Sequence, residues 1–349
     1  MILLTGATGF LGMTFLARLL EDDDGPDILL PVRARDRAGA RARLDEVLAM
    51  LYDQPPEGID RLRPVPGDIL DRGVGLAASE TRGVERVVHC AASIAFTLPL
   101  REARETNVGG TANVVGLCRQ LPALERLVHV STAYVSGRSS GAFGEEDFDV
   151  GQTFRNTYEQ TKWEAEYLVA RAGLPSTVVR PSIVVGESDS GWTSAFNVIY
   201  WPLQAFARGL LDEVAADPEG IVDIVGVDRV VDVLVAAMID PGASGTYHAV
   251  AGDTALTVSE LVERACEILE RPAPILLPPT APDPDDPTAV FAPYFDVEVA
   301  FRDDRARELA GPPRTTGLLE HTLGYAQRTR WGKRGLSRQA ARAQMEVRA

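Results

Sequence analysis

The chain has 349 residues, 45% of them apolar, which is enough for a sizeable hydrophobic core. Its net charge of −15 argues against nucleic acid and anionic membranes as partners, so any anionic ligand needs a local basic pocket. Cys90, Cys118 and Cys266 lie far apart, which predicts free thiols, no metal site and a cytoplasmic location. No apolar run reaches about 18 residues and the chain opens directly on a strand, so we expect neither a membrane span nor a signal peptide.

Short apolar strands alternate with helical stretches through the first half of the chain. We expect strands at 2–4, 28–32, 65–68, 87–91, 127–131 and 176–179, and the clearest helices at 10–20, 33–51 and 101–119. This alternation predicts an α/β fold, a doubly wound parallel sheet covered by helices on both faces.

The composition changes after about residue 185, where Gly, Trp, Phe and Tyr become frequent. We therefore expect a smaller α+β part to follow the sheet domain and to bind the substrate. The predicted organisation is a Rossmann domain at 1–185, which 221–252 can rejoin, a substrate-binding part at 186–220 and 253–330, and a basic tail at 331–349. Within it, the Pro- and Asp-rich stretch 272–293 is typical of an extended loop or lid, and the tail of a helix or a frayed end.

A glycine-rich turn leaves the first strand and opens the first helix. Glycines in that position let a backbone approach a pyrophosphate closely, and the helix N-terminus offers free N–H groups. The turn therefore predicts a dinucleotide site. Its expected contacts are Thr5, Gly6, Thr8, Gly9, Phe10, Leu11 and Gly12.

The second strand ends on Arg33 rather than on the acidic residue that accepts from the ribose of NAD. An arginine there can bind a 2′-phosphate, with Arg43 as a second cation, so NADP is favoured over NAD. The alternative is that these arginines form a solvated basic helix face. The ends of the next two strands supply the other expected cofactor contacts: Asp68 and Ile69 for the adenine, and Ala91, Ala92 and Ser93 for the pyrophosphate and ribose.

Tyr158 and Lys162 are four residues apart, which places a phenol and an amine on one face of a helix. The ammonium can lower the pKa of the phenol, and a phenol so tuned can act as an acid or a base. Thr132 ends a strand at the ligand-binding edge of the sheet, where it can hold a substrate oxygen or simply cap the strand. Asn107 is expected to brace the site through water or to distort its own helix.

These segments together resemble the extended short-chain dehydrogenase/reductase superfamily over roughly residues 1–270. The resemblance rests on TGATGFLG at 5–12, GDI at 67–69, STAYVSG at 131–137, YEQTK at 158–162 and RPSIVVG at 180–186. It implies that Thr132, Tyr158 and Lys162 are catalytic. It also implies that Pro181, Ser182 and Ile183 pass beside the nicotinamide and that Ser131 adjoins the cofactor.

Within the superfamily the sequence is most similar to fatty acyl-CoA reductases and to thioester reductase domains of carboxylic acid reductases and peptide synthetases. HCAASIAF at 89–96, TNVGGTANV at 106–114 and SGWTSAFN at 190–197 carry this likeness. It implies an acyl pocket near the active site, although aromatic side chains also serve as ordinary core. The expected pocket residues are Phe96, Tyr134, Trp192, Phe196, Asn197, Tyr200 and Trp201.

The resemblance implies an NADPH-dependent reductase that converts an acyl thioester, on coenzyme A or an acyl carrier protein, to an aldehyde or alcohol. The chain is expected to act as a monomer or homodimer. An aldehyde or ketone reductase of the hydroxysteroid dehydrogenase type needs the same three residues and stays open. Sugar-nucleotide dehydration is disfavoured by Ala133 and Tyr134, which replace an acidic pair, and epimerisation by the basic strand end at Arg33. A sensor that binds NADP without turnover is disfavoured by the intact Tyr158 and Lys162.

Overall fold

The computed structural model describes residues 1–279 and 294–346; most of the stretch expected to form a loop or lid, 280–293, lies outside them. A seven-stranded sheet forms the centre, in the order β12-β7-β5-β4-β1-β2-β3, and every neighbouring pair is parallel. This is the predicted doubly wound α/β fold. The strands are β1 (Ile2–Thr5), β2 (Ile28–Val32), β3 (Leu62–Pro66), β4 (Arg86–His89), β5 (Arg126–Val130), β7 (Ser176–Pro181) and β12 (Gly245–Ala249).

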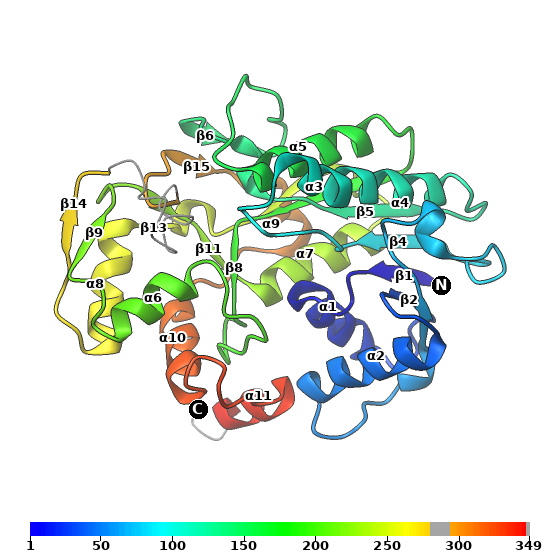
Figure 1. The fold of residues 1–349 in the computed structure, drawn as a ribbon, viewed down its shortest axis with the longest axis horizontal. Helices are drawn as coiled ribbons and strands as arrows, with labels where there is room; N and C mark the ends of the chain where they lie inside the picture. The colour runs from blue at the N-terminus through cyan, green and yellow to red at the C-terminus, as the bar shows by residue number, and fades with distance from the viewer. Residues whose placement is uncertain (280–293, 347–349) are drawn as a thin grey trace.

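Helices cover both faces of this sheet (Figure 1). One layer holds α1 (Phe10–Leu20), α2 (Arg37–Leu51) and α7 (Val227–Ile239), and the other holds α3 (Leu100–Arg104), α4 (Gly110–Cys118) and α5 (Thr157–Ala170). Alternate strand residues serve the two layers, because successive side chains of a strand point to opposite faces. Ile2 and Leu4 join the core beneath α1 and α7, whereas Leu3 joins the core beneath α4.

The two edges of the sheet are β3 and β12. β3 begins three residues before the predicted 65–68. The prediction started too late because Arg63 and Pro64 interrupt the apolar run of this strand. It is an edge strand, where charged residues and proline are tolerated. At the opposite edge β12 pairs with β7, so a segment from the second half of the chain completes the sheet.

A smaller part packs beside the carboxyl ends of the strands around a second core. Its short strands are paired two by two: β8 (Ile183–Val185) with β11 (Ile224–Gly226), β10 (Ile221–Val222) with β13 (Leu256–Thr257), β9 (Glu213–Ala215) with β14 (Ile275–Leu277), and β6 (Gly141–Phe143) with β15 (Val299–Phe301). Its helices are α6 (Tyr200–Ala207), α8 (Val258–Leu269) and α10 (Leu318–Arg328). The helix α9 (Asp304–Ala310) instead packs on α7 and β12, against the core of the sheet. No helix within the described ranges is both long and apolar enough to cross a membrane.

The C-terminal segment, expected as a helix or a frayed tail, forms α11 (Arg338–Glu346), which lies against α2 (Figure 1). Arg338 is buried, and its Nε donates to Glu187 at 2.5 Å. Arg342 also donates to Glu187, from Nη2 at 2.8 Å. This helix therefore ties the segment that follows β8 to the helical layer of the sheet.

Candidate active site

The turn between β1 and α1 fits its backbone so tightly that two of its glycines have no room for a side chain. Gly6 has φ +76°, and a Cβ on it would lie 2.6 Å from the amide nitrogen of Ala91 at the end of β4. A Cβ on Gly12 would lie 2.1 Å from the carbonyl oxygen of Gly6. Gly9 is the N-cap of α1 and no side chain caps the helix, so its first N–H groups remain for a ligand.

A cleft of about 380 Å³ lies over this turn. Its lining brings together residues from the ends of β1, β2, β3 and β4: Thr5, Gly6, Thr8, Gly9, Pro31, Val32, Arg33, Gly67, Asp68, Ile69, Leu70, Val74, Cys90, Ala91, Ala92, Ser93 and Thr106. The other expected cation, Arg43, is outside the lining, and its Nη1 donates to the carbonyl oxygen of Arg33 at 2.7 Å. A glycine cradle, an uncapped helix N-terminus and an arginine at one end fit a dinucleotide.

A second cavity, of about 290 Å³, continues this cleft and shares Gly6, Gly9, Cys90 and Ala92 with it. The remaining lining comes from α1, from the segment after β4, from the ends of β5 and β7, from α5, from β8 and the segment after it, and from Tyr294. It comprises Phe10, Leu11, Gly12, Ile94, Phe96, Val130, Ser131, Thr132, Tyr134, Tyr158, Lys162, Pro181, Ser182, Ile183, Val184, Ala195, Asn197, Val198 and Tyr294.

Thr132, Tyr158 and Lys162 face this cavity from two neighbouring elements. Asn156 caps α5 by accepting from the amide of Glu159 at 3.0 Å, which places Tyr158 in the first turn and Lys162 one turn later. Thr132 donates from Oγ1 to the carbonyl oxygen of Pro181 at 3.3 Å. Lys162 Nζ donates to the carbonyl oxygen of Val130 at 2.6 Å.

Burial is the largest influence on the pKa values of Tyr158 and Lys162. It raises the pKa of Tyr158 to about 12, against the opposing effect of a hydrogen bond with Thr132. Burial lowers the pKa of Lys162 to about 8, and the nearby carboxylate of Glu166 opposes that shift. The pKa of the phenol is therefore raised overall, so burial outweighs the lowering that was expected from a neighbouring ammonium. The phenol therefore stays protonated, as a proton donor requires.

Asn107 lies in a π-helical turn, Glu105–Gly109, that interrupts the helix expected at 101–119. Its Nδ2 donates to the carbonyl oxygen of Ser93 at 3.1 Å and to Thr161 Oγ1 at 3.0 Å, and its Oδ1 accepts from the amide of Ser93 at 2.8 Å. Asn107 lines neither cavity, so it positions Ser93 and α5 rather than touching the cofactor space.

The aromatic residues expected to form the acyl pocket divide into three groups. Phe96, Tyr134 and Asn197 line the catalytic cavity. Three others do not line it, because they pack against the core. Trp192 donates to the carbonyl oxygen of Leu336, and Tyr200 accepts from the amide of Gly186. Phe196 meets Tyr200 edge-on and stacks on Tyr325. Trp201 does not line it either, since it lies on the outer face of α6 with 55% of its surface exposed.

Tyr294 is a cavity residue that the sequence analysis did not identify. Its ring stacks on Phe96 at 5.3 Å between centroids and meets Tyr134 edge-on at 5.1 Å. Its hydroxyl accepts from Asn156 Nδ2 at 2.8 Å. No local signal marks it, because it follows the Pro- and Asp-rich stretch, 136 residues after Tyr158 in the chain.

Two of the four histidines, 40 residues apart in the chain, are neighbours in the sheet. His89 on β4 is in register with His129 on β5, and their rings are 5.4 Å apart. Burial lowers the pKa of both imidazoles, and Lys162 adds to the shift. Within residues 1–279 and 294–346 no three potential metal-ligating side chains gather at one point.

The fold and the glycine-lined cleft are those of a Rossmann dinucleotide-binding protein of the extended short-chain dehydrogenase/reductase type. Residues 4–234 match the family model described as male sterility protein, and the chain belongs to that NAD-binding family. This confirms the family resemblance expected from the motifs.

One similar relative is human fatty acyl-CoA reductase 1, which is 29% identical over 277 residues, 68% of this chain and 54% of the relative. The chain thus spans about half the length of the curated relatives it matches. Among solved structures, the terminal R domain of the myxalamid PKS-NRPS pathway superposes with a TM-score of 0.79 at 24% identity, over 95% of this chain and 91% of that one. UDP-glucuronic acid 4-epimerase of Bacillus cereus, in complex with NAD, superposes with a TM-score of 0.69 at 18% identity, over 94% and 98%. These two likenesses show the fold.

Proposed function

We propose that this protein is an NADPH-dependent reductase of acyl thioesters. One observation carries the proposal: Thr132, Tyr158 and Lys162 line a cavity that opens into the glycine-lined cleft. Family membership and the likeness to human fatty acyl-CoA reductase 1 support a thioester as the substrate.

NADPH would lie along the cleft with its pyrophosphate at the N-terminus of α1, where Gly6 and Gly12 let the turn pack closely on β4 and on itself. Arg33 would meet the 2′-phosphate, because it lines the cleft at the end of β2. Pro181, Ser182 and Ile183 line the catalytic cavity at the other end, where the nicotinamide would lie. When bound, NADPH supplies the hydride that reduces the carbonyl carbon.

The protein's own residues act on the carbonyl oxygen. The hydroxyls of Thr132 and Tyr158 donate to it as negative charge develops, which is where such donors contribute most. Tyr158 then gives its proton to that oxygen, and Lys162, charged below a pKa of about 8, stabilises the phenolate left behind. The tetrahedral hemithioacetal loses its carbon–sulfur bond, the sulfur leaves as a thiol with the hydroxyl proton, and the aldehyde remains. Reduction of the aldehyde to the alcohol in the same cavity would need a second NADPH for the hydride and a second proton from Tyr158.

The thiol portion of the substrate is coenzyme A or the phosphopantetheine of an acyl carrier protein. These two thiol carriers present the same thioester to the cavity, so they differ in the surface they contact outside it. Assays with an acyl-CoA and with the same acyl group on a carrier protein distinguish them by kcat/KM.

The proposal is tested by NADPH oxidation with an acyl-CoA, an aldehyde and a ketone side by side. The wild type is expected to oxidise NADPH with the acyl-CoA. Tyr158→Phe is expected to lower kcat by about 100-fold or more, because it removes the proton donor. Tyr167→Phe is the matched control, since it makes the same change on the exposed side of α5. Turnover of ketones with no turnover of any thioester contradicts the proposal.

A further inference from the structure

A buried hydrogen-bonded network passes through His89, a residue that the proposed mechanism does not use. His89 ends β4, and its Nδ1 lies 2.8 Å from the hydroxyl of Thr5 at the end of β1. Its Nε2 lies 3.2 Å from the hydroxyl of Thr111 on α4. All three side chains are buried. His89 therefore connects the strand that enters the glycine-rich turn to the helix that follows Asn107.

The protons of this network point in one direction. The hydroxyl of Thr111 donates its only proton to the carbonyl oxygen of Asn107 at 2.6 Å, so toward His89 it can only accept. The ring proton of His89 must therefore lie on Nε2. Burial lowers the pKa of His89 to about 3, so the imidazole is neutral and has no second proton. Nδ1 consequently accepts from the hydroxyl of Thr5.

One end of the network holds the glycine-rich turn against β4. The hydroxyl of Thr5 accepts from the amide of Ala91 at 3.3 Å while it donates to His89. This amide nitrogen is the atom on which Gly6 packs so closely that no Cβ fits between them. Thr5, Gly6 and Ala91 all line the cofactor cleft. By fixing the Thr5 hydroxyl, His89 fixes the shape of this part of the cleft.

The other end of the network holds the helix that carries Tyr158 and Lys162. Thr111 donates to the backbone of Asn107, and the Asn107 side chain donates to Thr161 Oγ1 at 3.0 Å. Thr161 is buried and directly precedes Lys162 on α5. His89 itself lines neither the cleft nor the catalytic cavity. It therefore acts on both through the residues to which it is hydrogen-bonded.

The neighbouring imidazole of His129 does not provide this connection. Its ring lies 5.4 Å from that of His89 between centroids. In the part of the chain that the structure describes, neither of its ring nitrogens has a hydrogen-bond partner. The connection from the glycine-rich turn to α5 therefore depends on His89.

We infer that His89 is a positioning residue, which holds the glycine-rich turn through its Nδ1 and the helix of Tyr158 and Lys162 through its Nε2–H. The inference rests on the proposed function for its effect on kcat, whereas its effect on NADPH binding is measured without an acyl substrate. Each ring nitrogen makes one buried hydrogen bond, and the loss of such a bond changes the quantity that depends on it by about tenfold.

Two amide substitutions separate the two halves of the network. His89→Asn keeps an acceptor for Thr5 near the position of Nδ1 but does not reach Thr111. It is expected to lower kcat with butyryl-CoA by about tenfold and to keep Kd for NADPH within about twofold. His89→Gln places an amide N–H near the position of Nε2 and leaves Thr5 without its acceptor. It is expected to raise Kd for NADPH by about tenfold and to keep kcat within about twofold. Fluorescence titration measures Kd, and NADPH oxidation at saturating cofactor measures kcat.

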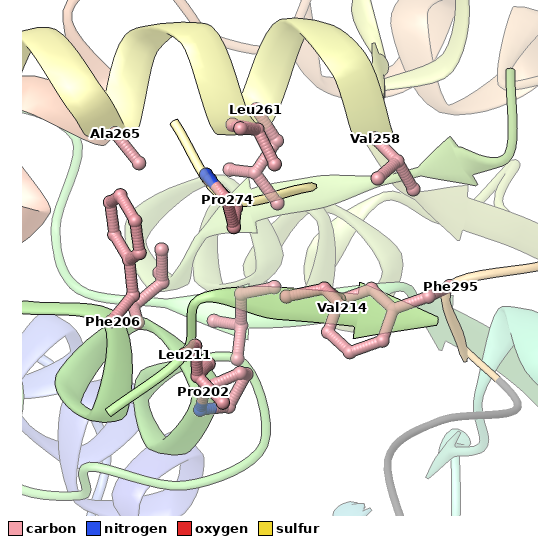
Figure 2. A pocket seen from close by; sticks show the side chains of 12 residues that line it. Pro202, Phe206, Leu211, Val214, Val258, Leu261, Ala265, Pro274 and Phe295 are labelled. Carbon is pink, nitrogen blue, oxygen red and sulfur yellow. The ribbon is translucent and has the colours of Figure 1, made fainter. Parts of the chain in front are cut away.

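A control variant separates positioning from a general loss of stability. The substrate part contains a cavity between α6, β9 and α8, and all twelve side chains that line it are apolar (Figure 2). It shares no lining residue with the cofactor cleft or the catalytic cavity. Leu261 of α8 lines it, so Leu261→Ala enlarges it and destabilises the fold. This variant is expected to unfold at lower urea concentration and to keep Kd and kcat within about twofold.

Equal changes of Kd and of kcat in His89→Asn and His89→Gln overturn the positioning role, as do changes no larger than those in Leu261→Ala. If neither His89 variant folds, Thr111→Val and Thr111→Ser keep the test decisive. Thr111→Val removes the hydroxyl and is expected to lower kcat by about tenfold with Kd unchanged, whereas Thr111→Ser keeps both near the wild type. The same kcat in these two variants again overturns the role.

Failure of the proposed function is distinguishable from failure of this inference. A Kd for NADPH that rises in His89→Gln but not in His89→Asn, in a protein that reduces no thioester, supports the positioning role and contradicts the proposed function. Conversely, a protein that reduces butyryl-CoA but whose two His89 variants behave alike supports the proposed function and overturns the positioning role.

Discussion

The side chain of Lys162 sets the charge beside the phenol of Tyr158. Its ammonium is buried and donates to the carbonyl oxygen of Val130, and burial lowers its pKa to about 8. The ammonium is therefore present below that pH and is lost above it. The phenol, with a pKa of about 12, keeps its proton throughout this range.

The pH dependence of reduction follows from the loss of the Lys162 ammonium as the pH rises. We expect kcat/KM for NADPH to be constant below about pH 7 and to fall tenfold per unit above the pKa of about 8, because the free enzyme loses its ammonium. Lys162→Arg keeps a positive charge, so its residual activity is expected to persist to higher pH. If kcat/KM falls at the same pH in the wild type and in Lys162→Arg, the fall does not come from Lys162.

At Arg33, the proposed contact to the 2′-phosphate predicts the choice of cofactor. Arg33→Ala is expected to raise KM for NADPH by about 10- to 100-fold and to leave KM for NADH unchanged, because a charge-assisted contact to the 2′-phosphate contributes about 1.5–3 kcal/mol. Arg41→Ala is the control, since Arg41 pairs with Asp45 on α2 and lies outside the cleft. Steady-state kinetics with both cofactors measure these KM values. An equal change in KM for NADPH and NADH contradicts a contact between Arg33 and the 2′-phosphate.

At the scale of elements, α11 connects the two parts of the molecule through buried ion pairs. Glu187 follows β8 and is buried, and Arg338 and Arg342 of α11 both donate to it. Burial alone would raise the pKa of Glu187, but the two arginines lower it. This carboxylate therefore stabilises the fold above its unfolded pKa, and the contribution is lost as the pH falls through the lower, folded value.

Replacing either arginine by alanine tests how much its ion pair with Glu187 contributes to stability. Arg338→Ala is expected to lower the free energy of unfolding by about 2–3 kcal/mol, because it removes the buried one of the two arginines that pair with the buried carboxylate of Glu187. Arg342→Ala is expected to cost less than about 1 kcal/mol, since Arg342 is half exposed. Urea unfolding measures both, and equal losses would show that burial of Arg338 does not matter.

The segments around the active site could be predicted where local pattern determines position. Spacing determines the local geometry of two motifs, the glycines between a strand and a helix and the Tyr and Lys four residues apart. Both motifs lie at the same end of the sheet. The sequence left two alternatives open at Asn107, bracing the site or distorting its helix, because its side-chain bonds join Ser93 and Thr161 from distant segments. A three-residue side-chain network of this kind leaves no periodic signal.

At the scale of the whole molecule, long-range packing decides which aromatic residues meet the substrate. Trp192 and Tyr200 have the composition expected of a pocket, yet the docking of α10 and α11 buries them in core. Tyr294 enters the cavity from a segment with no local pattern, because it packs on Phe96 and Tyr134. Residue type alone does not separate these outcomes, since aromatic side chains suit cores and pockets equally.

The central claim is that the reacting carbonyl lies in the cavity of Tyr158, next to the cofactor cleft. The most direct measurement is the mass of the product formed from dodecanoyl-CoA and NADPH deuterated at both C4 positions of its nicotinamide. The account predicts deuterium at the former carbonyl carbon, one atom in an aldehyde and two in an alcohol, and loss of this product in Tyr158→Phe but not in Tyr167→Phe. A reduced product without deuterium at that carbon, or the same labelled yield from Tyr158→Phe as from the wild type, would contradict it.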